Sequence, residues 1–199
     1  MTNNQQNRSR LKELLRKDAY FQEKIILSSG KESDYYIDAR RVTLASEGVY
    51  LSAQMILEEV KNDRFDAIGG PTLGADSLLG AIGVLSHQNG KPLNTFIVRK
   101  APKPHGRQQQ IEGPELKKGS SVILIDDVAT TGKAFVESLA VLEPMGVKVL
   151  KAICIVDRQE GAKDILAKKG CPLVSLFGIA EIRSGAPRAS PRSRPYPDS

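Results

Sequence analysis

The segment VILIDDVATTGKAF (residues 122–135) decides the fold, because it joins a buried strand, a polar loop and the start of a helix. Four branched apolar residues run into two adjacent aspartates, Asp126 and Asp127, and two threonines and a glycine follow before apolar spacing resumes. In an open parallel sheet, ligands bind at the carboxyl ends of the strands. The segment therefore predicts a strand that carries a carboxylate pair to the binding edge of a parallel sheet.

Strand and helix patterns alternate along most of the chain. From residue 46 apolar residues recur at helical spacing, with Ser46 as the expected N-cap. Near-continuous Val, Ile and Leu runs with short helical crossovers indicate a parallel sheet covered on both faces, so the predicted fold class is α/β. We predict helices at 46–60, 75–87, 131–146 and 161–170, and strands at 65–70, 94–100, 121–127, 147–157 and 172–178.

The first 45 residues have the pattern of a helix and a small hairpin, which together we call the hood. We predict the helix at about residues 8–21 and extended segments at 23–29 and 34–38. The expected organisation is thus the hood at 1–45, a core at 46–180 and a tail at 181–199. The tail is rich in Pro, Ser and Arg, and we expect it to be disordered.

One segment interrupts the alternation of strands and helices. Residues 101–117, APKPHGRQQQIEGPELK, contain three prolines, two glycines and only two large aliphatic residues. We expect no core element there, and loops of this length in compact domains are typically lids or disordered.

Charge and cysteine content limit the class of protein. The net charge of +6 belongs to the two ends, since residues 1–18 hold five basic and two acidic residues and residues 183–199 hold four and one, while the body is balanced. Nucleic acid is therefore an unlikely partner. Cys154 and Cys171 show no metal-binding spacing and indicate reduced thiols. No apolar run is long enough to span a bilayer and the polar start lacks the pattern of a secretory signal, so we expect a cytoplasmic protein with no membrane partner.

The loop after the acid pair favours a sugar phosphate as ligand. Small residues at a helix N-terminus let backbone amides surround a phosphate, and adjacent carboxylates suit the hydroxyls of a ribose. A Walker A loop is absent, because GxxxxGK[ST] does not occur. The structural alternative is a solvated Asp-Asp turn that caps a helix.

The chain resembles the type I phosphoribosyltransferases and, within them, the orotate phosphoribosyltransferase family. VILIDDVATTGKA is similar to the motif that binds phosphoribosyl pyrophosphate (PRPP), and the resemblance extends over residues 20–178. The other matching segments follow in the family's order: SSGKESDYYIDARRVTL, GGPTLGAD, VRKAPKPHGRQQQIEG and VDRQEG.

The resemblance implies a role for each matching position. Asp126 and Asp127 would hold the ribose hydroxyls, with Asp127 also counted as catalytic, and Arg158 would contact orotate. The residues implied to wrap the 5-phosphate are Val128, Ala129, Thr130, Thr131, Gly132, Lys133 and Ala134. Those implied around the pyrophosphate lie in GGPTLG, Leu73 and Gly74 among them, and in the cationic cluster Arg99, Lys100, Lys103 and His105, of which the last three are counted as catalytic. Thr130, Tyr35 and Tyr36 would complete the orotate site.

Each motif also has a structural interpretation. GGPTLG taken alone reads as an ordinary Gly-Pro turn, the cationic cluster as a solvated patch, and Arg158 as a surface arginine. Tyr35 and Tyr36 can equally be packing residues of a strand.

Three positions depart from the family pattern. Ser28 stands where the family usually has a lysine, and Lys31 is a candidate replacement. Gly74 stands where some members carry a lysine. Lys133 occupies a position of the phosphate loop that is often held by a small residue, where it would add charge or crowd the site.

The resemblance implies a Mg²⁺-dependent transfer of ribose 5-phosphate from PRPP to orotate, in the de novo route to UMP, by a homodimer with shared active sites. Two other functions stay open. One is a phosphoribosyltransferase for another base, such as a purine, against which the hood and Arg158 argue. The other is a non-catalytic PRPP sensor that binds nucleic acid through its basic ends.

Overall fold

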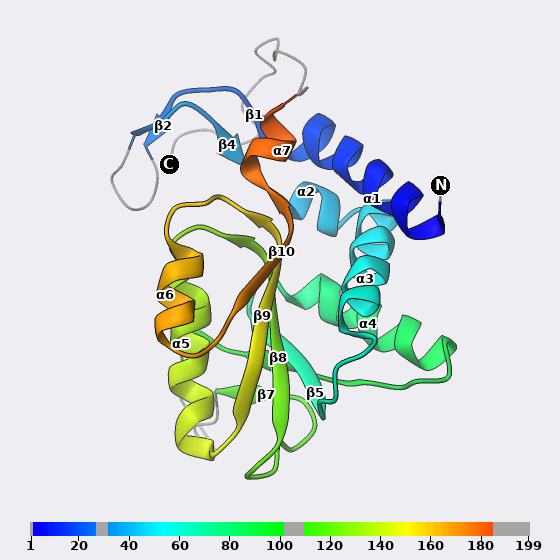
Figure 1. Cartoon of the computed structure of the whole chain (residues 1–199), viewed down its shortest axis with the longest axis vertical. Helices are drawn as coiled ribbons and strands as arrows, with labels where there is room; N and C mark the ends of the chain where they lie inside the picture. Colours follow the sequence, from blue (N-terminus) through cyan, green and yellow to red (C-terminus); the bar gives the residue numbers. More distant parts are fainter. Residues whose placement is uncertain (1, 27–31, 102–109, 185–199) are drawn as a thin grey trace.

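The computed structural model describes residues 2–26, 32–101 and 110–184. A six-stranded sheet forms its centre, in the order β10-β9-β8-β5-β6-β7 (Figure 1). All neighbours pair in parallel except β7 with β6. The strands are β5 (Ala67–Pro71), β6 (Asn94–Val98), β7 (Ile111–Glu112), β8 (Ser121–Ala129), β9 (Lys148–Asp157) and β10 (Leu173–Gly178).

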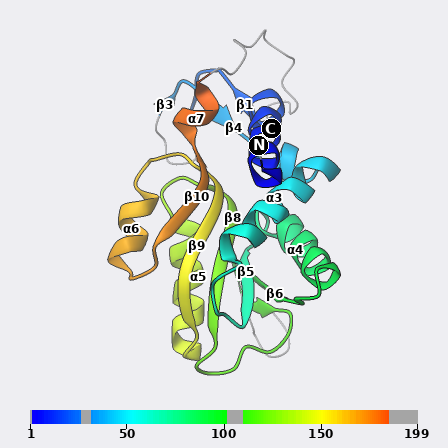
Figure 2. The same cartoon turned by 45° about the vertical axis from the view of Figure 1, so that its right-hand side comes forward.

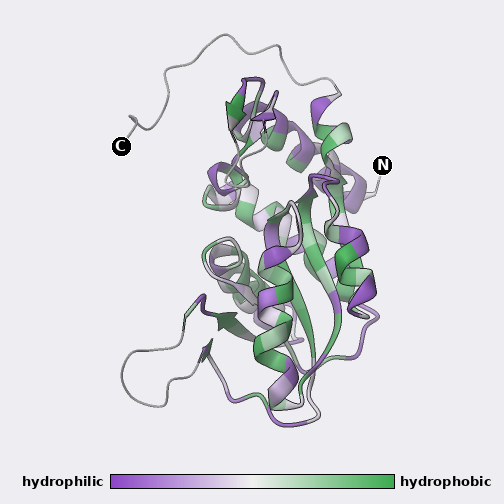
Figure 3. Cartoon of the chain, turned by 90° about the vertical axis from the view of Figure 1, so that its left-hand side faces the viewer, coloured by the Kyte–Doolittle hydropathy of each residue, from purple (hydrophilic) through white to green (hydrophobic). Residues whose placement is uncertain are grey.

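Helices cover both faces of the sheet, as the apolar runs predict. On one face lie α3 (Ser46–Val60) and α4 (Asp76–Gln88), and on the other lie α5 (Lys133–Leu142), which continues into a short 3-10 turn (Glu143–Met145), and α6 (Ala162–Lys168) (Figures 1 and 2). Strand β8 alternates between two cores: Ile123 and Ile125 pack with α3 and α4, whereas Val122 and Leu124 pack with α5 and α6. The predicted α/β class is confirmed, and hydropathy colouring shows the apolar strands between more polar helices (Figure 3).

The hood stands over the carboxyl ends of the strands (Figure 1). It contains α1 (Asn3–Leu14), a π-helical turn (Leu15–Ala19) and α2 (Arg40–Thr43). Its hairpin consists of two ladder fragments, in which β1 (Tyr20–Phe21) pairs with β4 (Tyr36–Ile37) and β2 (Ile25–Ile26) pairs with β3 (Glu32–Ser33). The predicted helix at 8–21 is therefore wrong at both ends.

Local chemistry explains these boundaries. Thr2 and Gln5 form a capping box that starts α1 early. Tyr20 and Phe21 leave the helix because their rings stack on Tyr35 and Tyr36, with centroids 5.8 and 6.2 Å apart.

Three further predictions need correction. Ala45, in an extended conformation, is the N-cap of α3, and Ser46 is the first helical residue. The segment predicted to hold no core element contains β7, which makes the sheet edge antiparallel because it pairs with β6. The tail is not disordered at its start, since α7 (Ile179–Arg183) is helical and Ile182 is fully buried. Residues 185–199 lie outside the described part of the chain. No helix in the described residues is long and apolar enough to cross a membrane.

Candidate active site

Asp126 and Asp127, the acid pair, lie near the end of β8, and Asp127 is two residues before the last strand residue, Ala129. Asp126 is 8% exposed, and Asp127 is half-buried. The amide of Asp127 donates to Asp126 Oδ1 at 2.9 Å, and the amide of Val128 donates to Asp127 Oδ1 at 2.7 Å. Burial raises the pKa of Asp126, and the Asp127 charge raises it further; burial likewise raises the pKa of Asp127. Burial therefore disfavours the charged form of both carboxyl groups as long as no ligand is bound to them.

The loop after β8 turns sharply into α5. Gly132 has a φ of +79°, which favours glycine, and it precedes the first helical residue, Lys133. Thr130 is half-buried, and Thr131 is exposed. The Lys133 side chain is 81% exposed and its ammonium lies 3.7 Å from Glu137, so it neither fills the loop nor crowds it.

The glycines of GGPTLG allow close packing around the acid pair. A Cβ on Gly69 would meet the Phe96 ring at 2.4 Å, and one on Gly70 would meet the carbonyl oxygen of Ile125 at 2.0 Å. A Cβ on Gly74 would lie 2.2 Å from Asp126 Oδ1 and 2.5 Å from Asp127 Oδ1. Gly74 is therefore the residue that lets this loop pass directly over the carboxylates.

The same loop is held by hydrogen bonds that sequence reasoning did not include. The amide of Thr72 donates to the carbonyl of Val98 at 3.1 Å, and its hydroxyl donates to Asp76 Oδ2 at 2.9 Å. The Thr72–Leu73 peptide bond is cis, and Leu73 is 62% exposed. The role of Asp76 was not predicted, although the residue stands at the end of the quoted motif GGPTLGAD.

Arg158 follows β9 and lies next to the start of the loop after β8. Its amide donates to the carbonyl of Ala129 at 2.9 Å, and its side chain is only 5% exposed. Nε donates to Glu160 Oε1 at 2.9 Å, and the guanidinium carbon lies 4.8 Å from the centroid of the Tyr35 ring. Nη2 is buried and has no hydrogen-bond partner among the described residues. A buried cationic donor without a partner is costly and suits an anionic ligand.

Tyr36 and its neighbours border the acid pair from the hood. Burial raises the pKa of Tyr36, and the nearby charges of Asp38, Arg40 and Asp127 modify it. Arg40 Nε donates to Asp38 Oδ1 at 2.9 Å, and the Arg40 charge favours ionisation of Asp127. Asp38 and Arg40 were not predicted, although both stand in the quoted segment DYYIDARR.

The structure brings only part of the predicted cationic cluster to this place. The Arg99 guanidinium lies 3.1 Å from Glu112 on β7, so it is engaged at the sheet edge. Lys100 is exposed, and its charge lowers the pKa of Asp126. This effect is smaller than the increase in pKa that burial causes. Lys103, His105, Ser28 and Lys31 lie outside the described residues.

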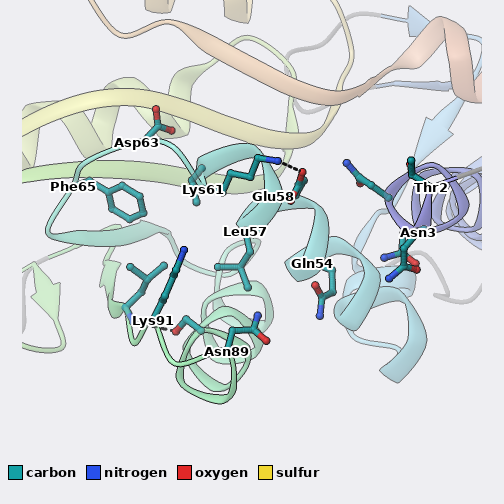
Figure 4. Close-up of a pocket in the computed structure, with 15 residues that line it drawn as sticks. Thr2, Asn3, Gln54, Leu57, Glu58, Lys61, Asp63, Phe65, Asn89 and Lys91 are labelled. Carbon is teal, nitrogen blue, oxygen red and sulfur yellow. Dashed lines mark hydrogen bonds and ion pairs between the residues drawn. The ribbon is translucent and has the colours of Figure 1, made fainter.

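A cavity of about 690 Å³ lies away from the acid pair (Figure 4). Phe65 and Leu93 line it just before β5 and β6 begin, so it is at the amino ends of these strands, opposite the acid pair. Of the two lysines that line it, Lys61 is paired with Glu58. We therefore place the candidate active site at the acid pair and not in this cavity.

Comparison with known proteins gives a consistent result. The model of the phosphoribosyl transferase domain family matches residues 43–179. Orotate phosphoribosyltransferase of Corynebacterium glutamicum (strain ATCC 13032) is 40% identical over 179 residues, which cover 90% of this chain and 95% of that protein. The Aquifex aeolicus enzyme of the same name is 42% identical, covering 78% and 85%. A crystal structure of Mycobacterium tuberculosis H37Rv orotate phosphoribosyltransferase in complex with PRPP has a TM-score of 0.74 and 31% identity, covering 88% and 98%.

Proposed function

The chain belongs to the orotate phosphoribosyltransferases of the phosphoribosyl transferase domain family, and we propose on this premise that it transfers ribose 5-phosphate from PRPP to orotate. A ring nitrogen of orotate attacks the anomeric carbon, the bond to pyrophosphate breaks, and orotidine 5-phosphate forms, as pyrimidine biosynthesis requires. The attacking atom belongs to the substrate, so the protein needs no nucleophile. Its task is to hold both substrates and to stabilise the charge that develops between them.

Asp126 and Asp127 are assigned to the ribose hydroxyls, and the loop from Val128 to Ala134 to the 5-phosphate. Two observations support this assignment: Asp126 is buried and Asp127 is half-buried near the end of β8, and helix α5, with Gly132 as its N-cap, starts a few residues later. Hydroxyl donors relieve the unfavourable burial of the carboxylates, because they supply hydrogen bonds in place of water. The helix N-terminus offers amides to an anion.

Arg158 is assigned to the orotate carboxylate. Its unpartnered Nη2, next to Glu160 and against the Tyr35 ring, is the observation that carries the choice of substrate. Because Nε is already engaged by Glu160, Nη2 remains for a ligand carboxylate, which a guanidinium binds strongly. Thr130 on the loop after β8 and Tyr36 on the hood are assigned to the same orotate site.

The leaving pyrophosphate is assigned to the loop that contains Leu73 and Gly74, together with Lys100, Lys103 and His105. Cations in these places stabilise the negative charge that grows on the departing oxygens. We propose further that the protein is a cytoplasmic homodimer and that the last two residues act in the partner's site. Exposed apolar side chains are available for such an interface at Leu44 (71%), Tyr50 (49%), Leu73 (62%) and Val84 (60%).

Mg²⁺ fits the acid pair by donor chemistry, since it prefers carboxylate oxygens and usually retains other oxygen ligands from the substrate phosphates. The described residues contain no cluster of three or more acidic, His or Cys side chains that would bind a metal alone. Asp126 and Asp127 are therefore the residues that would assist its binding. When bound, the ion supplies charge neutralisation for the pyrophosphate.

The test is to incubate the protein with PRPP, Mg²⁺ and orotate and to follow the loss of orotate absorbance. Adenine in place of orotate is the control for a purine-specific transferase. Arg158→Gln should abolish the preference for orotate, whereas Arg158→Lys should retain part of it. Tight PRPP binding without turnover of any base would support the sensor hypothesis instead, and steeply salt-dependent binding of nucleic acid would be its second sign.

A further inference from the structure

Arg183, the last residue of α7, contacts the hood in two ways. Its guanidinium forms an ion pair with Asp34, and its guanidinium carbon lies 5.9 Å from the centroid of the Tyr35 ring. The Arg183 side chain is 48% exposed, so it lies over the surface of the hood and not in its core. The end of the described chain thus reaches the same ring that Arg158 contacts.

Tyr35 is the common neighbour of these two arginines. The ring is buried, stacks on Tyr20 with an interplanar angle of 18°, and lies 4.8 Å from the Arg158 guanidinium carbon. Its hydroxyl lies 3.5 Å from Glu160, which also binds Arg158 Nε. A shift of the Tyr35 ring would therefore change the packing that orients Arg158.

Helix α7 is itself fixed by α1 and by the π-helical turn that follows α1. Arg16 donates to the carbonyl oxygens of Glu181, Ile182 and Ser184. Arg8 forms an ion pair with Glu181 at 3.0 Å and lies 4.5 Å above the Phe177 ring. The backbone that carries Arg183 is thereby held in place, so its side chain can act as a fixed support.

We propose that Arg183 is a positioning residue for orotate: with Asp34 it holds the Tyr35 ring against Arg158 and so sets the affinity for the base. The proposal rests on the proposed function. Arg183 touches neither the acid pair nor the loop after β8, so its effect is confined to one of the two substrates.

The size of the effect follows from the contacts. An exposed ion pair and a solvent-accessible cation–π contact are each modest, and Arg183 acts through one intervening ring. We expect Arg183→Ala to raise the KM for orotate by roughly three- to tenfold, with the KM for PRPP changed by less than about twofold. Arg183→Lys keeps a cation beside Asp34 and should recover most of the orotate affinity.

The experiment compares steady-state KM values for both substrates in the wild type, Arg183→Ala, Arg183→Lys and a matched control. The control is Arg10→Ala, which removes two exposed Arg–carboxylate pairs, those with Glu47 and Glu13, without touching an aromatic ring of the site. Melting temperatures identify any loss of fold, and Asp34→Asn breaks the same ion pair from the other side.

A selective rise in the orotate KM for Arg183→Ala and Asp34→Asn, absent in Arg10→Ala, supports the proposal. An unchanged orotate KM, or an equal rise for both substrates, overturns it while leaving the proposed function intact. A wild-type protein that does not turn over orotate would defeat the proposed function and this inference with it.

Discussion

Replacement of Gly74 by alanine tests whether the acid pair must stay where β8 places it. The new methyl group would lie 2.2 Å from Asp126 Oδ1 and 2.5 Å from Asp127 Oδ1, far inside ordinary contact distance. These two oxygens accept the hydrogen bonds from the amides of Asp127 and Val128. Gly74 is not among the glycines with positive φ in the described chain, so alanine can adopt its backbone, and the nearest atoms that its methyl group would meet belong to the two carboxylates.

The size of the clash sets the expected loss of activity. To restore a contact above 3 Å, the carboxylates or the loop must move by roughly 1 Å, and misplacement on this scale costs about 100-fold in rate. We therefore expect kcat/KM to fall by about two powers of ten, equivalent to about 2.7 kcal/mol. A lysine at this position should be no better in this chain, because its Cβ would meet the same two carboxylates.

The assay is orotate turnover together with PRPP affinity by calorimetry. Gly80→Ala is the matched control, since a Cβ there meets nothing within 4 Å and the residue lies inside α4. That substitution should leave kcat/KM unchanged and stabilise the fold by about 0.5–1 kcal/mol. A Gly74→Ala protein with kcat/KM within about threefold of wild type would show that the acids can move without consequence, which would refute their assignment to the ribose.

Three further outcomes are expected. Because burial raises the pKa of Asp126, the folded state binds the carboxyl proton more tightly than the unfolded chain does, and stability falls as pH rises through that raised pKa. Asp126→Asn should therefore raise the melting temperature more at pH 8 than at pH 4, while it weakens PRPP binding. An equal change in melting temperature at both pH values would contradict this expectation. Lys103→Ala combined with His105→Ala should lower kcat by about 100-fold or more with little effect on PRPP affinity. Mixing that variant with the Asp126→Asn protein should restore activity if sites are shared between subunits, and failure after verified subunit exchange would exclude sharing. A chain that ends at Ser184 should keep its melting temperature and its orotate KM, and a large loss in either would show that the residues beyond it bind the fold.

Long apolar runs made the core of the fold predictable. Elements that depend on contacts between residues distant in sequence could not be predicted in this way. Strands β5, β6, β8, β9 and β10 and the acid pair followed from local pattern, because each is encoded within one segment. Strand β7 is two residues long in a Pro- and Gly-rich segment and forms because β6 offers it an edge. The short helix α7 depends on Arg8 and Arg16, whose contacts with it span 165 to 173 residues of sequence.

Sequence motifs name the residues of the candidate site but do not predict how these residues pack. A motif identifies Arg158 and Gly74, yet only coordinates show that Nη2 is left without a partner in the described chain or that a methyl group would strike two carboxylates. The start of α1 could have been predicted from the capping-box spacing of Thr2 and Gln5, although the predicted helix began only at residue 8. Asp38, Arg40 and Glu160 stood inside the quoted motifs, but nothing in their identity distinguished them from surface charges.

The interlock of α1 with α7 has a consequence for the order of folding. During synthesis α1 and its π-helical turn emerge before α7, but Arg8 and Arg16 have no carbonyl partners until residues 176 to 184 have been made. Contacts of such long sequence separation form late, because the loop between them must close before they contribute. A nascent chain can thus assemble the sheet and the acid pair before α7 packs against α1 and its π-helical turn, so this part of the hood is completed last.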